Sequence, residues 1–435
     1  MAHEPFTRRT FLLGAVAAAT SGAVKFDESL ETLSDWLAAT PRARGQALQA
    51  CADRIRTLDR NIHAWVQVSP QPAIGSGKLS GIPFGAKDII ETKGLATEYG
   101  SPIYKGRIGT EDAAIVRELR RRGAVLMGKT HTTAFAYRTP APTRNPRNLE
   151  HTPGGSSSGS AAAVAAGMIP IALGTQTGGS VLRPASFCGI VGFKPTYGLL
   201  PMDGVLPFAK SLDTLGLFTN SASEMLALWD AMGYATGPGD GVEAVEFAAA
   251  DPMPEAEAPM TAAFGRAISA LRGAGVTVRS IDIAAMLTEL SGAARAVMFY
   301  EGARFHQQRY KEYGNRLADM ADLVREGLQI PVERYDGAKR FIDRCYGRVA
   351  DIYKGTPIIL VPAAPGPAPR GLASTGDSRM NAPWTALGTP AISLPMPVGR
   401  DLPLGLQLTS DRGQEARLLR AAVRVQRVLE GGASG

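Results

Sequence analysis

Two glycine–serine turns that flank a short alanine-rich segment constrain this sequence more than any other feature. The turns, residues 154–156 and 178–180, each read Gly-Gly-Ser. Glycine pairs permit positive φ angles and close backbone approach, so each serine can occupy a strained, exposed turn. Between the turns, residues 158–168 predict a helix and residues 169–174 a buried strand. We therefore expect a βα-type frame with chemistry in its turns, and not a flexible Gly/Ser linker.

The chain is long enough for a large hydrophobic core. Its 435 residues, 45% of them hydrophobic, show no clear interior boundary, and α/β folds of this size can form one unit. The net charge of +7 is spread along the chain, which gives no sign of nucleic-acid binding. Three distant cysteines and five histidines without paired spacing indicate neither a disulfide framework nor a metal enzyme.

Residues 1–25 differ from the rest of the chain. Arg8 and Arg9 precede an uncharged run, Thr10–Val24, that ends in small residues, which is the layout of a twin-arginine export signal. The run is shorter and less apolar than the roughly 20 residues of a membrane span, so we expect no stable membrane anchoring. This predicts a mature chain, residues 26–435, that is periplasmic or secreted.

Residues 123–130 match the phosphate-loop pattern GxxxxGK[ST] letter for letter. A phosphate loop needs a strand before its first glycine. Here a predicted helix precedes that glycine, and the variable residues form the predicted strand. We therefore do not expect ATP binding.

Residues 155–159, GSSSG, match a nucleophile elbow centred on Ser157. That motif needs a histidine later in the chain, and His306 is the one candidate. His306 lies in a polar, helical stretch where we expect it to face solvent. A serine–histidine hydrolase that uses Ser157 remains an alternative.

Lys87 lies inside an apolar predicted strand, near Ile82, Phe84 and Ile89. A free lysine has a pKa near 10.4, so only about one in 2,500 is neutral at pH 7, and burial favours the neutral form. Amide cleavage needs a nucleophile, a base, an acid and donors for the oxyanion. Because no histidine is well placed, lysine is the expected base in this serine-rich chain, as in known Ser-Lys enzymes.

The chain resembles the amidase signature family. The resemblance is carried by the two Gly-Gly-Ser turns, by SGIPFGAKD and GAVLMGKTHTTAFA upstream, and by FKPTYG, SLDTLG and residues 373–395 downstream. It extends from about residue 26 to about residue 430 and is weakest over residues 284–353. It implies a single α/β domain, with a large, mixed, twisted β-sheet covered by helices on both faces.

The resemblance also implies roles for individual residues. Ser180 would be the nucleophile, Ser156, with a cis peptide bond, the proton shuttle, and Lys87 the base and acid relay. The oxyanion hole would be formed by the amides of Thr177, Gly178, Gly179 and Ser180. Water would then hydrolyse the acyl-enzyme, and no cofactor is required.

Two positions depart from the family pattern. Gln176 stands where many relatives have Asp, and Leu182 stands where they have Arg, with Arg183 one position later. Neither position belongs to the implied catalytic trio, so the reaction class is unaffected. A substrate-binding Asp/Arg pair cannot be assumed, however.

These features predict an exported amidase that hydrolyses a small-molecule carboxamide, or an aryl ester or carbamate, through a serine acyl-enzyme. One alternative is the amidase subunit of a tRNA-dependent amidotransferase, which needs cytosolic partners and tRNA. Another is a non-catalytic binding module on the same fold. No motif identifies the residues that bind the substrate.

Overall fold

The structure is a computed structural model that describes residues 30–235 and 246–431. The predicted export signal, residues 1–25, lies outside these ranges. Within them, no helix combines the length and the hydropathy that a membrane crossing requires.

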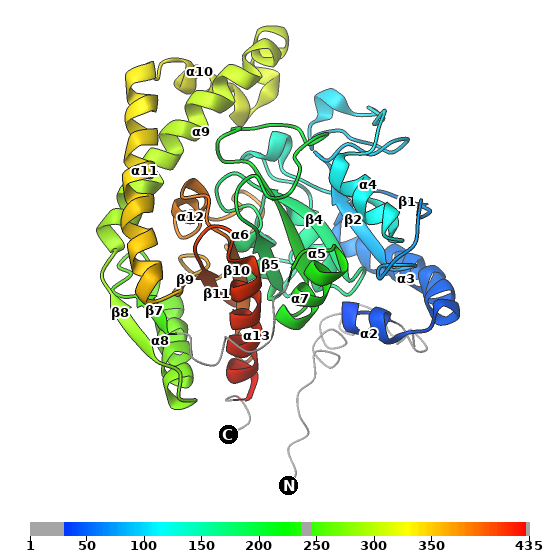
Figure 1. The fold of residues 1–435 in the computed structure, drawn as a ribbon. Coiled ribbons are helices and arrows are strands. Elements are labelled where there is room, and N and C mark those ends of the chain that lie inside the picture. Colours follow the sequence, from blue (N-terminus) through cyan, green and yellow to red (C-terminus); the bar gives the residue numbers. More distant parts are fainter. Residues whose placement is uncertain (1–29, 236–245, 432–435) are drawn as a thin grey trace.

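One mixed sheet of eleven strands organises the described residues (Figure 1), in the order β1-β3-β2-β4-β6-β5-β10-β11-β9-β7-β8. Parallel pairs join β2 to β3 and β4, and β7 to β8 and β9, whereas the other neighbours are antiparallel. The strands are β1 (Trp65–Gln71), β2 (Pro83–Lys87), β3 (Val125–Thr130), β4 (Ile171–Gln176), β5 (Val191–Lys194), β6 (Thr214–Thr219), β7 (Phe247–Ala250), β8 (Val278–Ile281), β9 (Ile358–Pro362), β10 (Ala391–Met396) and β11 (Leu404–Thr409). The predicted fold class is confirmed.

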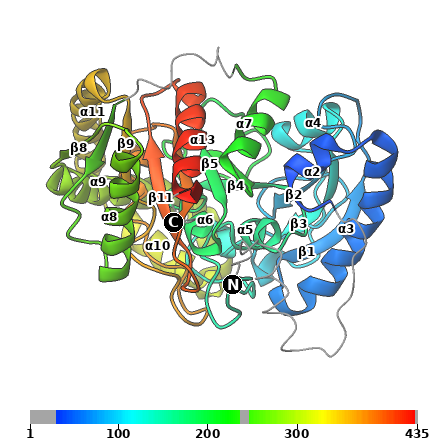
Figure 2. The ribbon, with the colours of Figure 1, turned by 90° about the horizontal axis from the view of Figure 1, so that it is seen from below.

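Helices cover both faces of this sheet. Figure 2 shows α7 and α13 on one face and α5 and α6 on the other. The α-helices of the described residues are α2 (Leu33–Ala38), α3 (Pro41–Ile62), α4 (Ala114–Arg121), α5 (Ser158–Ala165), α6 (Leu182–Cys188), α7 (Ala222–Ala231), α8 (Ala258–Gly273), α9 (Ala284–Tyr313), α10 (Asp319–Leu328), α11 (Val332–Gly355), α12 (Ala382–Ala386) and α13 (Glu415–Gly431).

The predicted βα frame is present with shifted boundaries. Helix α5 ends at Ala165 because Gly167 follows in the left-handed conformation, with φ of 68°. All of α5 and β4 is buried, and small side chains such as Ala161 let the helix lie close to the sheet. The frame therefore places both Gly-Gly-Ser turns beside the central strands β2 and β4.

Strand β7 begins at the residue where the sequence predicts a strand to end. The sequence predicts a strand over residues 242–247, of which 242–245 lie outside the described residues, and β7 spans Phe247–Ala250. Strand β7 lies between the parallel neighbours β8 and β9 and is buried throughout. Such a strand needs a continuous apolar run, which the sequence Phe-Ala-Ala-Ala provides and an alternating pattern does not.

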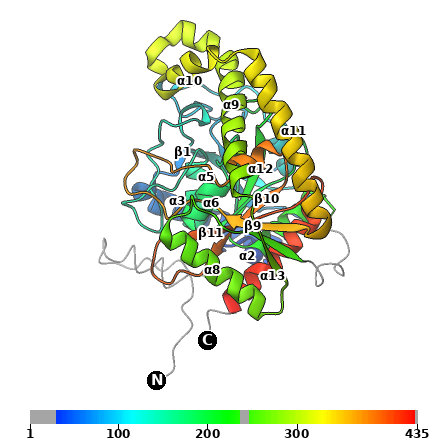
Figure 3. The ribbon, with the colours of Figure 1, turned by 90° about the vertical axis from the view of Figure 1, so that its left-hand side faces the viewer.

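Residues 284–353, where the resemblance is weakest, are predicted from the sequence to be mostly helical, and they are. Figure 3 shows α9 and α11 side by side, extending away from the sheet, with α10 at their far end. Helix α9 also packs on α12, close to the turn that carries Ser180. This segment therefore contributes a wall to the cavity described below.

Candidate active site

Lys87 is the last residue of β2 and is fully buried. Its Nζ lies 2.7 Å from Ser156 Oγ and 2.8 Å from Thr175 Oγ1. Burial lowers the pKa of Lys87 well below its usual range, and the carboxylate of Asp213 opposes this only in part. A neutral amine can donate to Thr175 and accept a proton from Ser156. The predicted burial of Lys87 is thus confirmed, and its surroundings suit a base.

The adjacent Asp88 is no partner of Lys87. Its two carboxylate oxygens accept from the amides of Glu98, at 2.9 Å, and Gly100, at 3.0 Å. Burial raises the pKa of Asp88 to about 6, and the charge of Lys129 counteracts this rise. The carboxylate is therefore used to hold the segment after β2 in place.

Residues 123–130 do not form a phosphate loop. All but the first two belong to strand β3, which extends through Thr130. Lys129 is fully buried, and its Nζ donates to Ile90 O and Thr97 Oγ1. A lysine in this position cannot reach a nucleotide phosphate.

The turn before α5 carries Ser156. Its peptide bond with Gly155 is cis, and Gly154 has a φ of 81°. A Cβ atom on Gly154 would lie 2.9 Å from Pro184 Cα, so this position requires glycine. Ser156 is only 2% exposed, because the surrounding loops cover the turn.

Ser157 has a structural role in the same turn. It is fully buried, its Oγ donates to Thr175 O at 3.2 Å, and its amide donates to Ser180 O at 3.4 Å. The second contact joins the two Gly-Gly-Ser turns. Ser157 therefore does not present a free hydroxyl to a substrate, as a nucleophile elbow requires.

The second turn, residues 177–180, connects β4 to α6 and lines the cavity. Among the residues that the structure describes, the amides of Gly178, Gly179 and Ser180 have no hydrogen-bond acceptor. A Cβ atom on Gly179 would lie 2.4 Å from Asn381 Oδ1, so only glycine fits there. The turn thus offers amides to a developing oxyanion.

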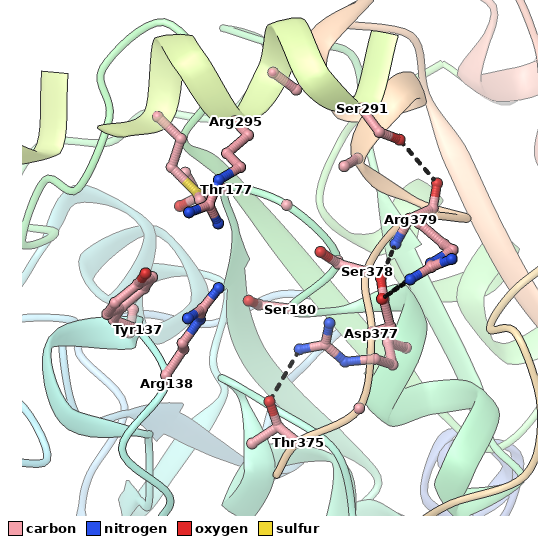
Figure 4. A pocket seen from close by; sticks show the side chains of 18 of the residues that line it. Tyr137, Arg138, Thr177, Ser180, Ser291, Arg295, Thr375, Asp377, Ser378 and Arg379 are labelled. Atoms are coloured by element: carbon pink, nitrogen blue, oxygen red, sulfur yellow. Dashed lines mark hydrogen bonds and ion pairs between the residues drawn. The ribbon is translucent and has the colours of Figure 1, made fainter. Parts of the chain in front are cut away.

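Both serines were expected on exposed turns, and this was wrong. Ser180 is 8% exposed and lies among the residues that line the cavity (Figure 4). Helix α9 and the segment 374–379 line the same cavity. Burial is compatible with the expected chemistry, since a site shielded from water strengthens hydrogen bonds to a developing charge.

Gln176, one of the two departures from the family pattern, holds the second turn in place. Its Oε1 accepts from the amides of Val181, at 2.8 Å, and Leu182, at 3.0 Å, at the start of α6. Its Nε2 donates to Thr385 Oγ1 at 3.0 Å, and the Thr385 hydroxyl donates to Gly178 O at 2.7 Å. A neutral amide thus links α6, α12 and the turn. Leu182 is fully buried, which leaves the neighbouring Arg183 to reach the cavity.

Sequence reasoning missed Asp213 and Thr175. Asp213 Oδ1 accepts from Thr177 Oγ1 at 2.6 Å, and its Oδ2 accepts from the amides of Phe208 and Ala209. Burial raises the pKa of Asp213 to about 6. The segment SLDTLG, which contributes to the resemblance, was the available signal for Asp213. No motif marked Thr175, because its contact with Lys87 exists only once β4 lies next to β2.

The predicted solvent exposure of His306 is wrong. The side chain is fully buried in α9, and its ring packs against Phe135, Phe208 and Phe305, with centroids 5.0–5.9 Å away. Neither ring nitrogen has a hydrogen-bond partner among the described residues. Burial lowers the pKa of His306 to about 3. The polar neighbours in its sequence occupy other faces of α9, which the local pattern did not reveal.

A cavity of about 690 Å³ opens in front of Ser180. Its walls come from residues 136–138, the turn 177–180, helix α9 and the segment 374–379, shown in Figure 4. Within residues 30–235 and 246–431, no group of three His, Cys, Asp or Glu side chains is arranged to hold a metal ion. The cavity can admit a small organic molecule.

Known proteins resemble this chain in sequence and in fold. The family described as Amidase matches residues 46–236. The glutamyl-tRNA(Gln) amidotransferase A-subunit of Geobacter metallireducens is 31% identical, over 91% of this chain and 96% of that protein. The crystal structure of an amidase superposes with a TM-score of 0.80 at 26% identity, covering 90% of this chain and 96% of the other. The crystal structure of the glutamyl-tRNA(Gln) amidotransferase A-subunit from Thermotoga maritima gives a TM-score of 0.78 at 27% identity, covering 92% of this chain and 95% of the other.

Proposed function

Because the chain belongs to the amidase signature family, we propose that it hydrolyses carboxamide C–N bonds through an acyl-enzyme formed on Ser180. The observation that carries this proposal is the 2.7 Å contact between Lys87 Nζ and Ser156 Oγ. The contact lies in a fully buried position beside the turn that contains Ser180. The substrate is a small-molecule amide, or an aryl ester or carbamate that follows the same route.

The proposed reaction begins with neutral Lys87. Lys87 takes the proton of Ser156, and Ser156 takes that of Ser180, whose Oγ attacks the carbonyl carbon of the substrate. The amides of residues 177–180 donate to the oxyanion. The proton returns through Ser156 to the leaving amine as the C–N bond breaks. A water molecule then attacks the ester on Ser180 and releases the acid, with its proton passing along the same path.

The test is the combined loss of turnover and covalent labelling. We expect purified protein to hydrolyse at least one compound in a series of anilides, primary amides, carbamates and esters. A fluorophosphonate should label Ser180, as mapped by mass spectrometry. Ser180→Ala should lose both hydrolysis and labelling. Ser291→Ala, which removes a hydroxyl from the opposite wall of the cavity, should retain labelling. Hydrolysis that persists in Ser180→Ala would refute the assignment.

A second candidate is the amidase subunit of a tRNA-dependent amidotransferase. The full-length similarity to proteins of that name favours it. This candidate predicts glutamine hydrolysis that appears only when the partner subunits of such a complex are added. Hydrolysis of anilides by the isolated chain supports the first candidate instead. A chain that is neither labelled nor active under either condition would be a non-catalytic binding module.

We also propose that residues 1–25 direct export and that residues 26–435 form the catalytic unit. The twin arginine, Arg8 and Arg9, supports this. Cell fractionation of the full chain should find it outside the cytosol, and replacing both arginines with lysine should retain it there. Cytosolic wild-type protein would contradict export and would favour the amidotransferase candidate.

A further inference from the structure

The cavity in front of Ser180 is rich in positive charge. Its lining contains four arginines but only two carboxylates: Arg138, Arg183, Arg295, Arg379, Glu255 and Asp377. Figure 4 shows Arg138 and Arg295 on one side of the cavity and Asp377 and Arg379 on the other. The distribution of their partners therefore determines which wall can bind a charged ligand.

On one wall the charges are already compensated. Arg379 Nη2 lies 2.6 Å from Asp377 Oδ2, and its Nη1 lies 3.7 Å from Glu255 Oε2. Arg183 donates to Gly155 O at 2.6 Å, and Asp377 is the acid that acts on its guanidinium. Both carboxylates of the cavity lining thus interact with the arginines of this wall.

The other wall carries Arg138 and Arg295. Arg138 is exposed, and within the described residues its guanidinium contacts no carboxylate; it lies 5.3 Å from the ring centroid of Tyr137. Arg295 extends from α9 over the ring of Phe299, at 4.0 Å. Its ion pair with Glu326 spans 3.3 Å between side chains that are 51% and 60% exposed, and such a pair contributes little. Both guanidinium groups are therefore available to a ligand.

The two guanidinium groups point into the same space. Figure 4 shows Arg138 and Arg295 reaching from separate elements toward the region before Ser180, with Tyr137 beside them. Burial raises the pKa of Tyr137, the charges of Arg138 and Arg295 counteract this rise, and the carboxylates of Glu326 and Asp319 add to it. Apolar side chains, Phe208 and Met298, line the cavity as well. The arrangement fits a molecule with a reactive carbonyl, a short apolar section and an anionic end.

We propose that the amide substrate carries a carboxylate, which binds between Arg138 and Arg295. This inference rests on the proposed function and specifies its substrate class. The planar guanidinium donates two parallel hydrogen bonds to a carboxylate, so a pair of arginines both attracts and orients such a group. A substrate held in this way has its amide carbonyl directed at Ser180 by a contact remote from the reacting bond.

Matched substrate pairs test this inference. The first pair is glutaric acid monoanilide and its methyl ester, and the second is 4-(hexanoylamino)benzoate and its methyl ester, which place the charge on the acyl or the amine side. We expect kcat/KM to favour the carboxylate by about tenfold or more in one pair. The preference should shrink in ~0.5 M salt, because exposed charges are screened. Equal values within both pairs would overturn the inference and leave the amidase assignment intact.

Variants test whether Arg138 and Arg295 cause the preference for the carboxylate substrate. Arg138→Gln and Arg295→Gln should each reduce the ratio of kcat/KM, carboxylate over ester, by about tenfold. Arg316→Gln, which removes an exposed arginine outside the cavity lining, should leave the ratio as in the wild type. Thermal unfolding verifies that each variant is folded. An unchanged ratio in both cavity variants would refute the role of this wall.

Direct binding separates this inference from the proposed function. Calorimetry with Ser180→Ala measures the affinity of each pair without turnover. Tighter binding of the carboxylate supports the inference, and equal binding overturns it. Absence of hydrolysis by the wild type, with selective binding retained, would mean that the proposed function fails while the anion site remains.

Discussion

Thr175→Val tests whether Lys87 is the base. The substitution keeps the side-chain shape and removes the hydroxyl that lies 2.8 Å from Lys87 Nζ. When Lys87 accepts the proton, its ammonium group loses this acceptor, and a hydrogen bond to a charged group contributes about 1.5–3 kcal/mol. At about 1.4 kcal/mol per tenfold change, kcat/KM should fall by about 10- to 150-fold.

The pKa of Lys87 determines the direction in which the pH–rate profile of Thr175→Val should move. The hydroxyl stabilises the protonated amine more than the neutral one, so its removal lowers the pKa of Lys87 further. Turnover requires neutral Lys87, whose fraction rises with pH. The acid limb of the kcat/KM profile should therefore move to lower pH while the plateau falls. The measurement is a pH–rate profile with a neutral anilide.

Thr219→Val is the matched control for this experiment. Thr219 ends β6, is fully buried, and donates to Ser221 O at 2.9 Å, outside the site. This variant should lose about 1 kcal/mol of unfolding free energy, with an unchanged pH profile. A Thr175→Val enzyme within about threefold of wild-type kcat/KM, and with the acid limb unmoved, would refute the assignment of Lys87 as the base.

Two further predictions concern stability, measured by urea unfolding. Gln176→Leu leaves the amides of Val181 and Leu182 without their acceptor, so the free energy of unfolding should fall by about 2–4 kcal/mol. Gln176→Glu keeps an acceptor and should recover most of this loss; equal stability of the two variants would contradict the capping role. The folded-state pKa of His306, about 3, lies below the ordinary value of 6.5, so the unfolded chain binds the proton first and stability falls as pH drops below 6.5. Between pH 6.5 and pH 4.5, the free energy of unfolding should fall by about 2–3 kcal/mol less in His306→Leu than in the wild type. The variant should also retain amide hydrolysis, and its inactivation would favour a serine–histidine mechanism.

Local chemistry made several elements predictable from the sequence. The sequence predicts a helix with Thr40 as its N-cap and Pro41 at its first position, and α3 begins in this way, because a hydroxyl acceptor and a preset φ act within one turn of helix. The sequence also predicts a closing helix over residues 414–429, and α13 spans Glu415–Gly431. The burial of Lys87 followed from the apolar residues beside it. These features depend on neighbours in the sequence.

Features that depend on distant neighbours were not predictable. His306 is buried because Phe135 and Phe208 come from other parts of the chain. The strand residues 248–250 of β7 were not predicted, because the burial of this strand depends on β8 and β9. The contact of Thr175 with Lys87 requires the order of β2 and β4 in the sheet. The walls of the cavity meet only in the folded chain, so no motif indicated Arg138 or Arg295.

The projecting helix α9 has a consequence for how specificity can evolve in this chain. It supplies Ser291, Arg295 and Met298 to the cavity, whereas every group proposed to act on the scissile bond comes from β2, β4 and the two Gly-Gly-Ser turns. Mutations in α9 can therefore alter which molecules are accepted while leaving bond cleavage untouched. Substrate specificity and the chemical step can thus change separately during evolution, because different elements of the fold carry them.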